Sequence, residues 1–173
     1  MNAHVSNITV KTGSEYSLEC LYNRSYLEPI YEVNGDSLRI NQKGPKNLNN
    51  TGNAHCSIVI TIPRFSNLDE VEITNNVGDI FVSDFDCNDF DVKNNVGDIT
   101  VEAVNTPSMK IENNVGDVEV SGITDLDSYN IDASTNVGNV EVGGRYCKRQ
   151  YLSNTSSRTK IFVKTNVGDV ELN

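Results

Sequence analysis

Acidic residues that recur at one place in a repeated phrase are the residues of this chain best suited to chemistry. Each directly follows a glycine, and the set is Asp79, Asp98, Asp117 and Asp169, with the neutral Asn139 at the equivalent position of the fourth repeat. If the repeats stack as neighbouring β-strands, these carboxylates lie about 4.8 Å apart and repel one another by about 1 kcal/mol even in water. Three explanations are a bound cation, a pair of catalytic carboxylates and a set of turn caps.

A cation would offset the repulsion, because Ca²⁺ takes carboxylate oxygens as ligands. Its ligands would be Asp79, Asp98, Asp117 and Asp169. Repeat-toxin β-rolls bind Ca²⁺ through a Gly-Gly-x-Gly-x-Asp phrase with a nonapeptide period, and this chain lacks that phrase. We therefore expect no metal and no other cofactor. The favoured interpretation is that each aspartate caps its own turn by accepting backbone N–H groups.

Neighbouring carboxylates at this spacing also approach the separation of about 5 Å found in retaining glycosidases. Such a site needs one carboxylate whose environment differs from that of its partner, and a regular column makes the carboxylates alike. The chain has two histidines, His4 and His55, and no Ser/His/Asp or Cys/His pattern. We therefore predict that the protein is not an enzyme and has no catalytic residues.

The elements that position the column come from a phrase repeated five times. It reads NNVGD or a close variant around Gly78, Gly97, Gly116, Gly138 and Gly168, so the steps are 19, 19, 22 and 30 residues. A repeat of this length indicates stacked structural units. Within each repeat, apolar residues alternate on both sides of the phrase, which predicts two short strands joined by a tight turn.

The pattern predicts an all-β protein, a right-handed parallel β-helix (β-solenoid). It would have about five regular coils of about 19–22 residues and an irregular N-terminal strand region. The handedness follows from the strong preference of parallel crossovers. The turn glycine is expected at positive φ, and the asparagines are expected to form an amide ladder. The valines of the phrase are expected to form one internal column: Val77, Val96, Val115, Val137 and Val167.

We interpret residues 1–173 as a single β-helix domain. Residues 1–70 would be opening and capping strands, 71–142 regular coils, 143–159 a basic insertion and 160–173 the last coil. The last coil would leave an open strand ladder at 168–172. Because open edges invite pairing with another copy, a homodimer joined at the coil ends is one hypothesis.

The insertion is basic in a chain whose formal net charge is −10. Residues 143–167 hold six basic residues and no acidic one. They could form a solvated loop, or a cap over the end of the coil. They could also bind an anionic partner such as an acidic glycan, through Arg145, Tyr146, Lys148, Arg149, Tyr151 and Arg158.

Composition limits the partners further. The acidic balance argues against nucleic acid and anionic membranes. No apolar run reaches the roughly 18 residues of a membrane span, and no signal peptide begins at Met1. The protein would be cytoplasmic, or this chain would lack an upstream signal or anchor. The four cysteines, Cys20, Cys56, Cys87 and Cys147, are widely spaced, and we predict free thiols.

Two strand phrases precede the repeats, Ser-Leu-Arg-Ile at 37–40 and Ile-Val-Ile-Thr-Ile-Pro at 58–63. Followed by Gly-Asp-Ile coils at near-20 spacing, they resemble a bacterial family of putative adhesins, a domain of unknown function with a β-helical fold. The resemblance implies a secreted or membrane-anchored protein without established catalytic residues. We therefore predict a non-catalytic cell-envelope or surface-exposed binding module. Alternatives are a structural or signalling scaffold that docks a partner protein through its coil end, and a carbohydrate-active β-helix enzyme.

Overall fold

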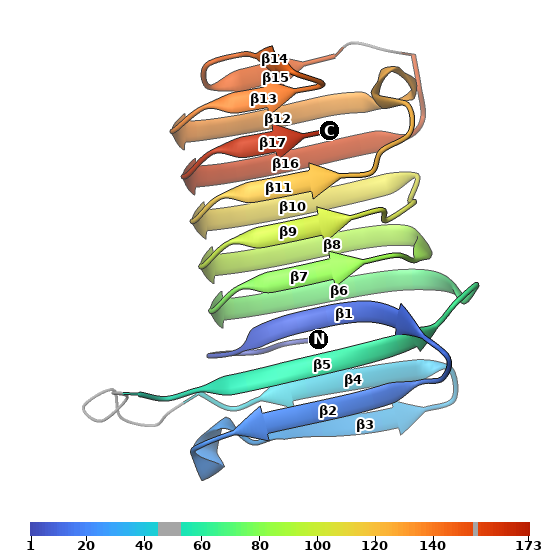
Figure 1. The fold of residues 1–173 in the computed structure, drawn as a ribbon, viewed down its shortest axis with the longest axis vertical. Helices are drawn as coiled ribbons and strands as arrows, with labels where there is room; N and C mark the ends of the chain where they lie inside the picture. Colours follow the sequence, from blue (N-terminus) through green and yellow to red (C-terminus); the bar gives the residue numbers. More distant parts are fainter. Residues whose placement is uncertain (45–52, 154–155) are drawn as a thin grey trace.

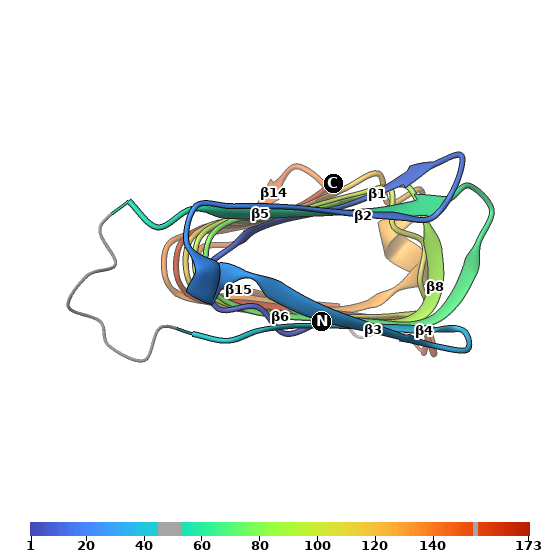
Figure 2. The same ribbon diagram turned by 90° about the horizontal axis from the view of Figure 1, so that it is seen from below.

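The computed structural model describes residues 1–44, 53–153 and 156–173. Within these residues the chain is all-β, as predicted, and most neighbouring strands run parallel. Two sheets face each other across a narrow interior, which Figure 2 shows from one end of the stack. No helix among the described residues is long and apolar enough to cross a membrane.

Figure 1 shows the strands stacked along one long axis. The nine-stranded sheet has, in spatial order, β14 (Arg145–Tyr146), β13 (Val140–Val142), β17 (Val170–Leu172), β11 (Val118–Ser121), β9 (Ile99–Glu102), β7 (Ile80–Ser83), β1 (Asn7–Gly13), β5 (Cys56–Pro63) and β2 (Ser17–Tyr22). The six-stranded sheet has β15 (Gln150–Leu152), β12 (Asn130–Val137), β16 (Lys160–Val167), β10 (Ser108–Val115), β8 (Asp86–Val96) and β6 (Asn67–Val77). A hairpin is formed by β3 (Pro29–Asn34) and β4 (Ser37–Gln42), and short 3₁₀ turns lie at η1 (Ser25–Leu27) and η3 (Leu126–Ser128).

Each regular layer, here called a rung, joins one strand of the six-stranded sheet to one strand of the nine-stranded sheet through the Asn-Val-Gly turn. The rungs are β6–β7, β8–β9, β10–β11, β12–β13 and β16–β17. Their registers align equivalent residues: Val96 pairs with Val77 and Val115, and Ile99 pairs with Ile80 and Val118. Equivalent side chains therefore stack in columns along the molecule.

The core lies between the two sheets and uses the same positions in each rung. In the β8–β9 rung the buried residues are Phe90, Val92, Ile99, Val101 and Val104. With their equivalents they form one continuous cluster, and a smaller cluster surrounds Leu27, Ile40, Cys56 and Ile58. Burial of one such aliphatic side chain contributes roughly 1.5–3 kcal/mol, so these columns are the main source of stability.

All four cysteines are free, as predicted. Cys56 and Cys87 are buried in the core. Burial raises the pKa of the Cys87 thiol to about 11. Since the thiolate is the reactive form, this residue is a small core side chain rather than a nucleophile.

The turn valines do not form the predicted internal column. They are 39–59 % exposed, whereas Asn75, Asn94, Asn113, Thr135 and Thr165 are buried at the corner. Strand alternation continues inward through Ile73 to Asn75, whose amide donates to the carbonyls of Ser6 and Gly78. The chain turns directly after this residue, so Val77 lies on the outer side of the corner.

The last rung does not lie at the end of the stack. The β16–β17 rung fits between β10–β11 and β12–β13, so Val170 pairs with both Val118 and Val140. The predicted open ladder at 168–172 is therefore wrong, because both edges of this strand are paired. A dimer cannot form through it without displacing another rung.

The first residues of the chain form a further, degenerate rung that the repeat analysis missed. Val5 pairs with Val77, Ile8 with Ile80, and Asn2 bridges Thr74 and Asn41. The phrase His-Val-Ser-Asn-Ile at 4–8 thus takes the place of Asn-Val-Gly-Asp-Ile. The valine and the isoleucine that the two phrases share were the sequence signal that could have revealed this rung.

The turn glycines have positive φ, as predicted, and they also lie close to the turn of the neighbouring rung. Gly97 has φ +128°, and a Cβ built there would lie 2.3 Å from the carbonyl oxygen of Gly78. We expect Gly97→Ala to lower the free energy of unfolding by about 3 kcal/mol or more, because strain and backbone overlap add. Urea unfolding followed by circular dichroism measures this.

Gly144→Ala is the matched control. Gly144 also has positive φ, +73°, but nothing lies within 4 Å of the position that a Cβ would take there. We expect a loss of about 1 kcal/mol for this variant, the cost of a left-handed conformation. Equal losses for the two variants would show that close stacking of the turns contributes nothing.

Candidate functional site

The aspartate column is held by hydrogen bonds between rungs. The backbone N–H of Asp98 donates to Asp79 Oδ1 at 3.0 Å, and that of Asp117 donates to Asp98 Oδ1 at 2.8 Å. The N–H of Asp169 donates in turn to Asp117 Oδ1 at 2.8 Å. The prediction that each aspartate caps its own turn is therefore wrong: each caps the turn of the next rung, because the stacked turns place one carboxylate beneath the following amide.

Both ends of this column are neutral. Asn7 Oδ1 accepts from the N–H of Asp79, and the N–H of Asn139 donates to Asp169 Oδ1 at 2.8 Å. Tyr146 then donates its hydroxyl to Asn139 Oδ1 at 2.5 Å. Asparagine keeps the acceptor oxygen without the charge, so the four carboxylates are bounded by residues that add no further repulsion.

The arrangement gives these aspartates no distinct chemistry. All four are exposed and accept the same type of bond from the same neighbouring position. A glycosidase pair would need different environments for its two carboxylates. Among the described residues, no three or more His, Cys, Asp or Glu side chains are grouped so that they could hold a metal ion.

An amide ladder lies beside the column, as predicted. The Nδ2 of Asn95 donates to Asn76 Oδ1 at 3.2 Å, and that of Asn114 donates to Asn95 Oδ1 at 3.0 Å. Asn166 and Asn136 continue the ladder at 2.6 and 2.8 Å. On the inner side, the Nδ2 groups of Asn94 and its equivalents donate to the turn carbonyls. The Oδ1 atoms of Asn75 and Asn94 are buried without a partner among the described residues.

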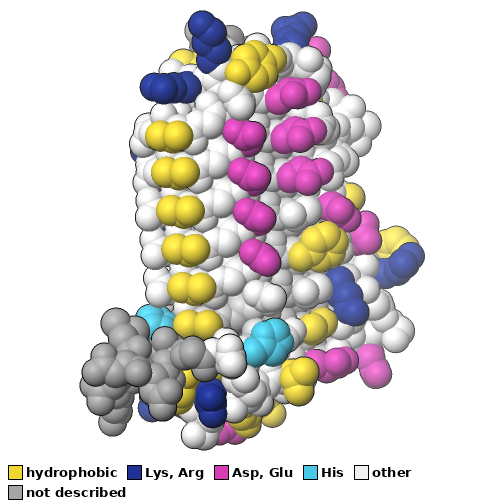
Figure 3. All heavy atoms as spheres, turned by 60° about the vertical axis from the view of Figure 1, so that its left-hand side comes forward, with side chains coloured by type: hydrophobic (Ala, Val, Ile, Leu, Met, Phe, Trp, Pro, Cys, Tyr) yellow, Lys and Arg dark blue, Asp and Glu magenta, His cyan; other side chains and the backbone are white. Residues whose placement is uncertain are grey.

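One side of the molecule therefore carries regular columns of like side chains. Figure 3 shows a hydrophobic column, formed by the turn valines, next to a column of aspartates. A second acidic column follows, because Glu119 pairs with Glu171 and Glu171 with Glu141.

Residues 143–153, here called the cap segment, close one end of the stack. β14 pairs antiparallel with β13, and β15 pairs antiparallel with β12. Further backbone bonds join Val140 N–H to Lys148 O at 2.6 Å and Thr135 N–H to Arg149 O at 2.9 Å. The β12–β13 rung thus has its outer edge covered, which supports the cap interpretation of the basic insertion.

The predicted binding residues lie in three different settings. Arg145, Tyr146, Lys148 and Arg149 are exposed on the cap segment, and Figure 3 shows basic side chains gathered at this end. Tyr151 is half-buried and packs against the core, so it has a structural role. Arg158 is exposed but lies outside the cap segment, on the segment that leads into β16.

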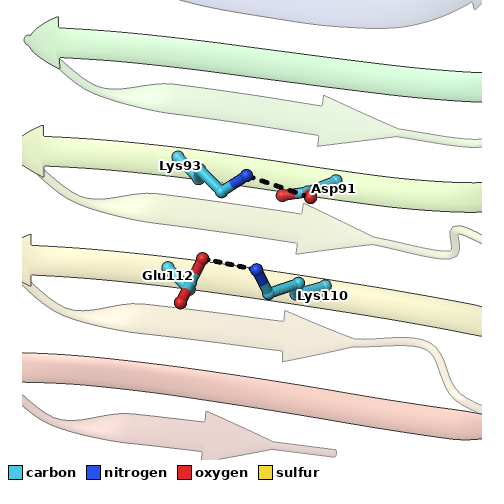
Figure 4. A network of polar contacts seen from close by, with 4 residues as sticks. All are labelled: Asp91, Lys93, Lys110 and Glu112. Carbon is cyan, nitrogen blue, oxygen red and sulfur yellow. Dashed lines mark hydrogen bonds and ion pairs between the residues drawn. The ribbon is translucent and has the colours of Figure 1, made fainter.

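Within the described part of the chain, the exposed cations of the cap segment form no ion pair with an acidic side chain. The ion pairs found among the described residues join Lys93 to Asp91 at 3.2 Å and Lys110 to Glu112 at 2.6 Å. Both lie on the outer face of the six-stranded sheet, on β8 and β10 (Figure 4). Arg145, Lys148 and Arg149 therefore present three uncompensated positive charges at one end of an acidic protein.

Comparison with known proteins supports this fold. The family model described as Toastrack DUF4097 matches residues 1–125. The structure is similar to the crystal structure of a putative cell adhesion protein from Clostridium sporogenes, with a TM-score of 0.74 at 18 % sequence identity, over 99 % of this chain and 89 % of that one. No curated protein matches the chain.

Two substitutions at Asp98 separate the effect of the hydrogen-bond acceptor from the effect of the negative charge. Asp98→Asn keeps an acceptor oxygen for the N–H of Asp117 and removes one of four neighbouring charges. We expect the free energy of unfolding to rise by about 1 kcal/mol at low salt, and the gain to shrink at high salt. Asp98→Ala should instead lower it by about 1 kcal/mol, because the acceptor is lost.

Urea unfolding of both variants at low and high NaCl concentration measures these changes. If Asp98→Asn destabilised the protein as much as Asp98→Ala, the charge itself would be required. That result would revive the cation hypothesis, which unfolding with and without Ca²⁺ would then decide.

Proposed function

Because the chain belongs to the Toastrack DUF4097 family, we propose that it is a non-catalytic binding module exposed at the bacterial cell surface. Its structural relative is described as a putative cell adhesion protein, which supports a surface location. We further propose that the stacked rungs form a right-handed parallel β-helix, since nearly all parallel crossovers have this hand.

The observation that carries the proposal is the charge of the cap segment. Three exposed cations lie on one end of a chain whose formal net charge is −10. The acidic side chains elsewhere on the surface repel anions, so an anionic partner is directed to this end. We propose that the partner is an anionic polymer of the cell surface, which Arg145, Lys148 and Arg149 contact.

A non-catalytic role is supported by the regularity of the acidic columns. Their carboxylates are exposed and share one type of environment along the stack. The protein is therefore proposed to act by binding rather than by turnover.

A second candidate function is a scaffold that docks a partner protein through the end of the stack opposite the cap segment. Exposed apolar residues on β2 and β3, among them Leu21, Tyr31 and Val33, favour it. The two functions are compatible, since they use opposite ends.

Binding to polyphosphate and to hyaluronate, measured by isothermal titration calorimetry, tests the first function. We expect the wild type to bind at least one of them, with an affinity that falls as salt rises. Lys148→Ala/Arg149→Ala should lose about tenfold or more in affinity, since each cation near an anionic surface contributes about 1 kcal/mol.

Lys11→Ala/Arg64→Ala is the control, because it removes the same charge from exposed positions on and beside β1 and β5. It should change the affinity by less than about twofold. Absence of binding to both polymers, or an equal loss in the control, would contradict a specific role for the cap segment.

The surface location has a separate test. Protease treatment of intact native cells should release peptides from residues 143–159, detected by mass spectrometry. Release only after lysis would contradict the surface location and favour the scaffold function inside the cell.

A further inference from the structure

Among the residues that the structure describes, nothing covers the end of the stack opposite the cap segment. There the nine-stranded sheet ends with β2, and the β3–β4 hairpin follows the six-stranded sheet through the bridge that Asn2 makes to Thr74 and Asn41. Among the described residues, no strand pairs with the outer edge of β2 or β3. Residues 14–42, which contain these strands, are here called the open end.

Apolar side chains that face the interior are exposed at the open end. Tyr31 pairs with Ile40 and Val33 with Leu38, so these four residues share one face of the hairpin. Ile40 is buried in the smaller core cluster, whereas Tyr31 is 63 %, Val33 66 % and Leu38 41 % exposed. The inner face of the hairpin thus continues past the core, and no other described residue covers it. Free edges and exposed apolar faces of this kind mark sites of protein association.

The two ends have opposite charge. The open end holds five acidic and two basic residues, a net charge of −3: Glu15, Glu19, Arg24, Glu28, Glu32, Asp36 and Arg39. All seven are exposed. The cap segment holds three basic residues and no acidic one. It also exposes two large apolar side chains, Tyr146 at 64 % and Leu152 at 62 %.

We propose that the open end binds the cap segment of a second copy of this chain, so that the copies join head to tail. Tyr31 and Val33 would contact Tyr146 and Leu152, while the acidic residues around them face Lys148 and Arg149. The inference rests on the proposed function, because it takes the cap segment as the binding surface and names one anionic partner for it.

The sheets of the two copies are suited to this arrangement. The nine-stranded sheet ends with β14 at the cap segment and with β2 at the open end, and each runs antiparallel to its neighbour. The six-stranded sheet and hairpin likewise end with β15 and β3. Stacking along the common axis continues both sheets from one copy to the next. A contact between two different surfaces that stacks the copies along one axis does not close into a ring, so it produces linear chains.

Pairing of two open ends is the competing arrangement. It would place two surfaces of net charge −3 against each other, which repel. Charge therefore favours the cap segment over a second open end as the occupant.

Complementation between two variants tests the inference. Lys148→Glu/Arg149→Glu reverses the charge of the cap segment and leaves the open end intact. Tyr31→Ser/Val33→Ser removes apolar contacts from the open end and leaves the cap segment intact. These four side chains are exposed, and circular dichroism with thermal unfolding verifies that both variants fold. Val96→Ser/Val115→Ser is the matched control, because it removes half-exposed valines from the side of the stack.

Sedimentation velocity gives the readout. We expect the wild type and the control to form chains that lengthen with protein concentration and shorten with salt. Each end variant alone should be monomeric, and their equimolar mixture should form dimers and no longer species. The inference is overturned if the wild type stays monomeric, if the cap variant alone dimerises through its open end, or if the mixture stays monomeric.

Polyphosphate binding separates this inference from the proposed function. Tyr31→Ser/Val33→Ser should bind polyphosphate at least as tightly as the wild type, because its cap segment is unchanged and no second copy covers it. Polyphosphate binding without chain formation would overturn the head-to-tail contact alone. Chain formation without binding to polyphosphate or hyaluronate would overturn the polymer partner and leave the second copy as the partner.

Discussion

Contact between the turn glycines of successive rungs is the constraint on which the structure depends. A Cβ at Gly116 would lie 2.1 Å from the carbonyl oxygen of Gly97, and the same closeness recurs at each regular turn. This contact brings each corner close enough for the inner asparagine to donate to the neighbouring turn carbonyl. It also places each carboxylate beneath the next amide. Core packing stabilises the stack, and the corner sets its register.

The same contact explains where the repeat is allowed to change. The added Cβ at Gly78 would meet the carbonyl of Ser6, and that at Gly97 the carbonyl of Gly78, so each glycine is crowded by the rung on the side of the open end. Ser6 has no such rung beside it. Its side chain instead meets Gln42, whose Oε1 accepts from Ser6 Oγ and from the N–H groups of His4 and Val5. The first rung can therefore carry serine where the others require glycine.

Sequence reasoning predicted the rungs, the amide ladder and the positive φ of the glycines, because each depends on residues within one repeat. It could not predict the order of the rungs, since β16 aligns equally well with β10 and β12: Val163 pairs with Ile111 on one side and Ala133 on the other. Sequence reasoning placed Val77 in the core, because the alternation of apolar and polar residues does not reveal where a corner begins. At the candidate site it identified Arg145, Lys148 and Arg149, but the structural role of Tyr151 depends on packing that the pattern does not contain.

The parallel stack has a direction, and this direction makes its two ends different. Each aspartate accepts from the rung nearer the cap segment, so the hydrogen bonds of the column all run one way from Asn7 to Asn139. At one end Tyr146 satisfies the last acceptor, and strands of the cap segment pair with the final rung. At the other end Gln42 accepts from the N–H groups of the first turn, but no strand of the described part of the chain covers the hairpin beyond it. Because the four aspartates and three stacked glutamates make the side of the stack acidic, like charge disfavours sideways association between copies. The exposed basic side chains therefore lie on the cap segment, and the exposed apolar and acidic side chains lie on the open end. Both sets are found where the regular repeat stops.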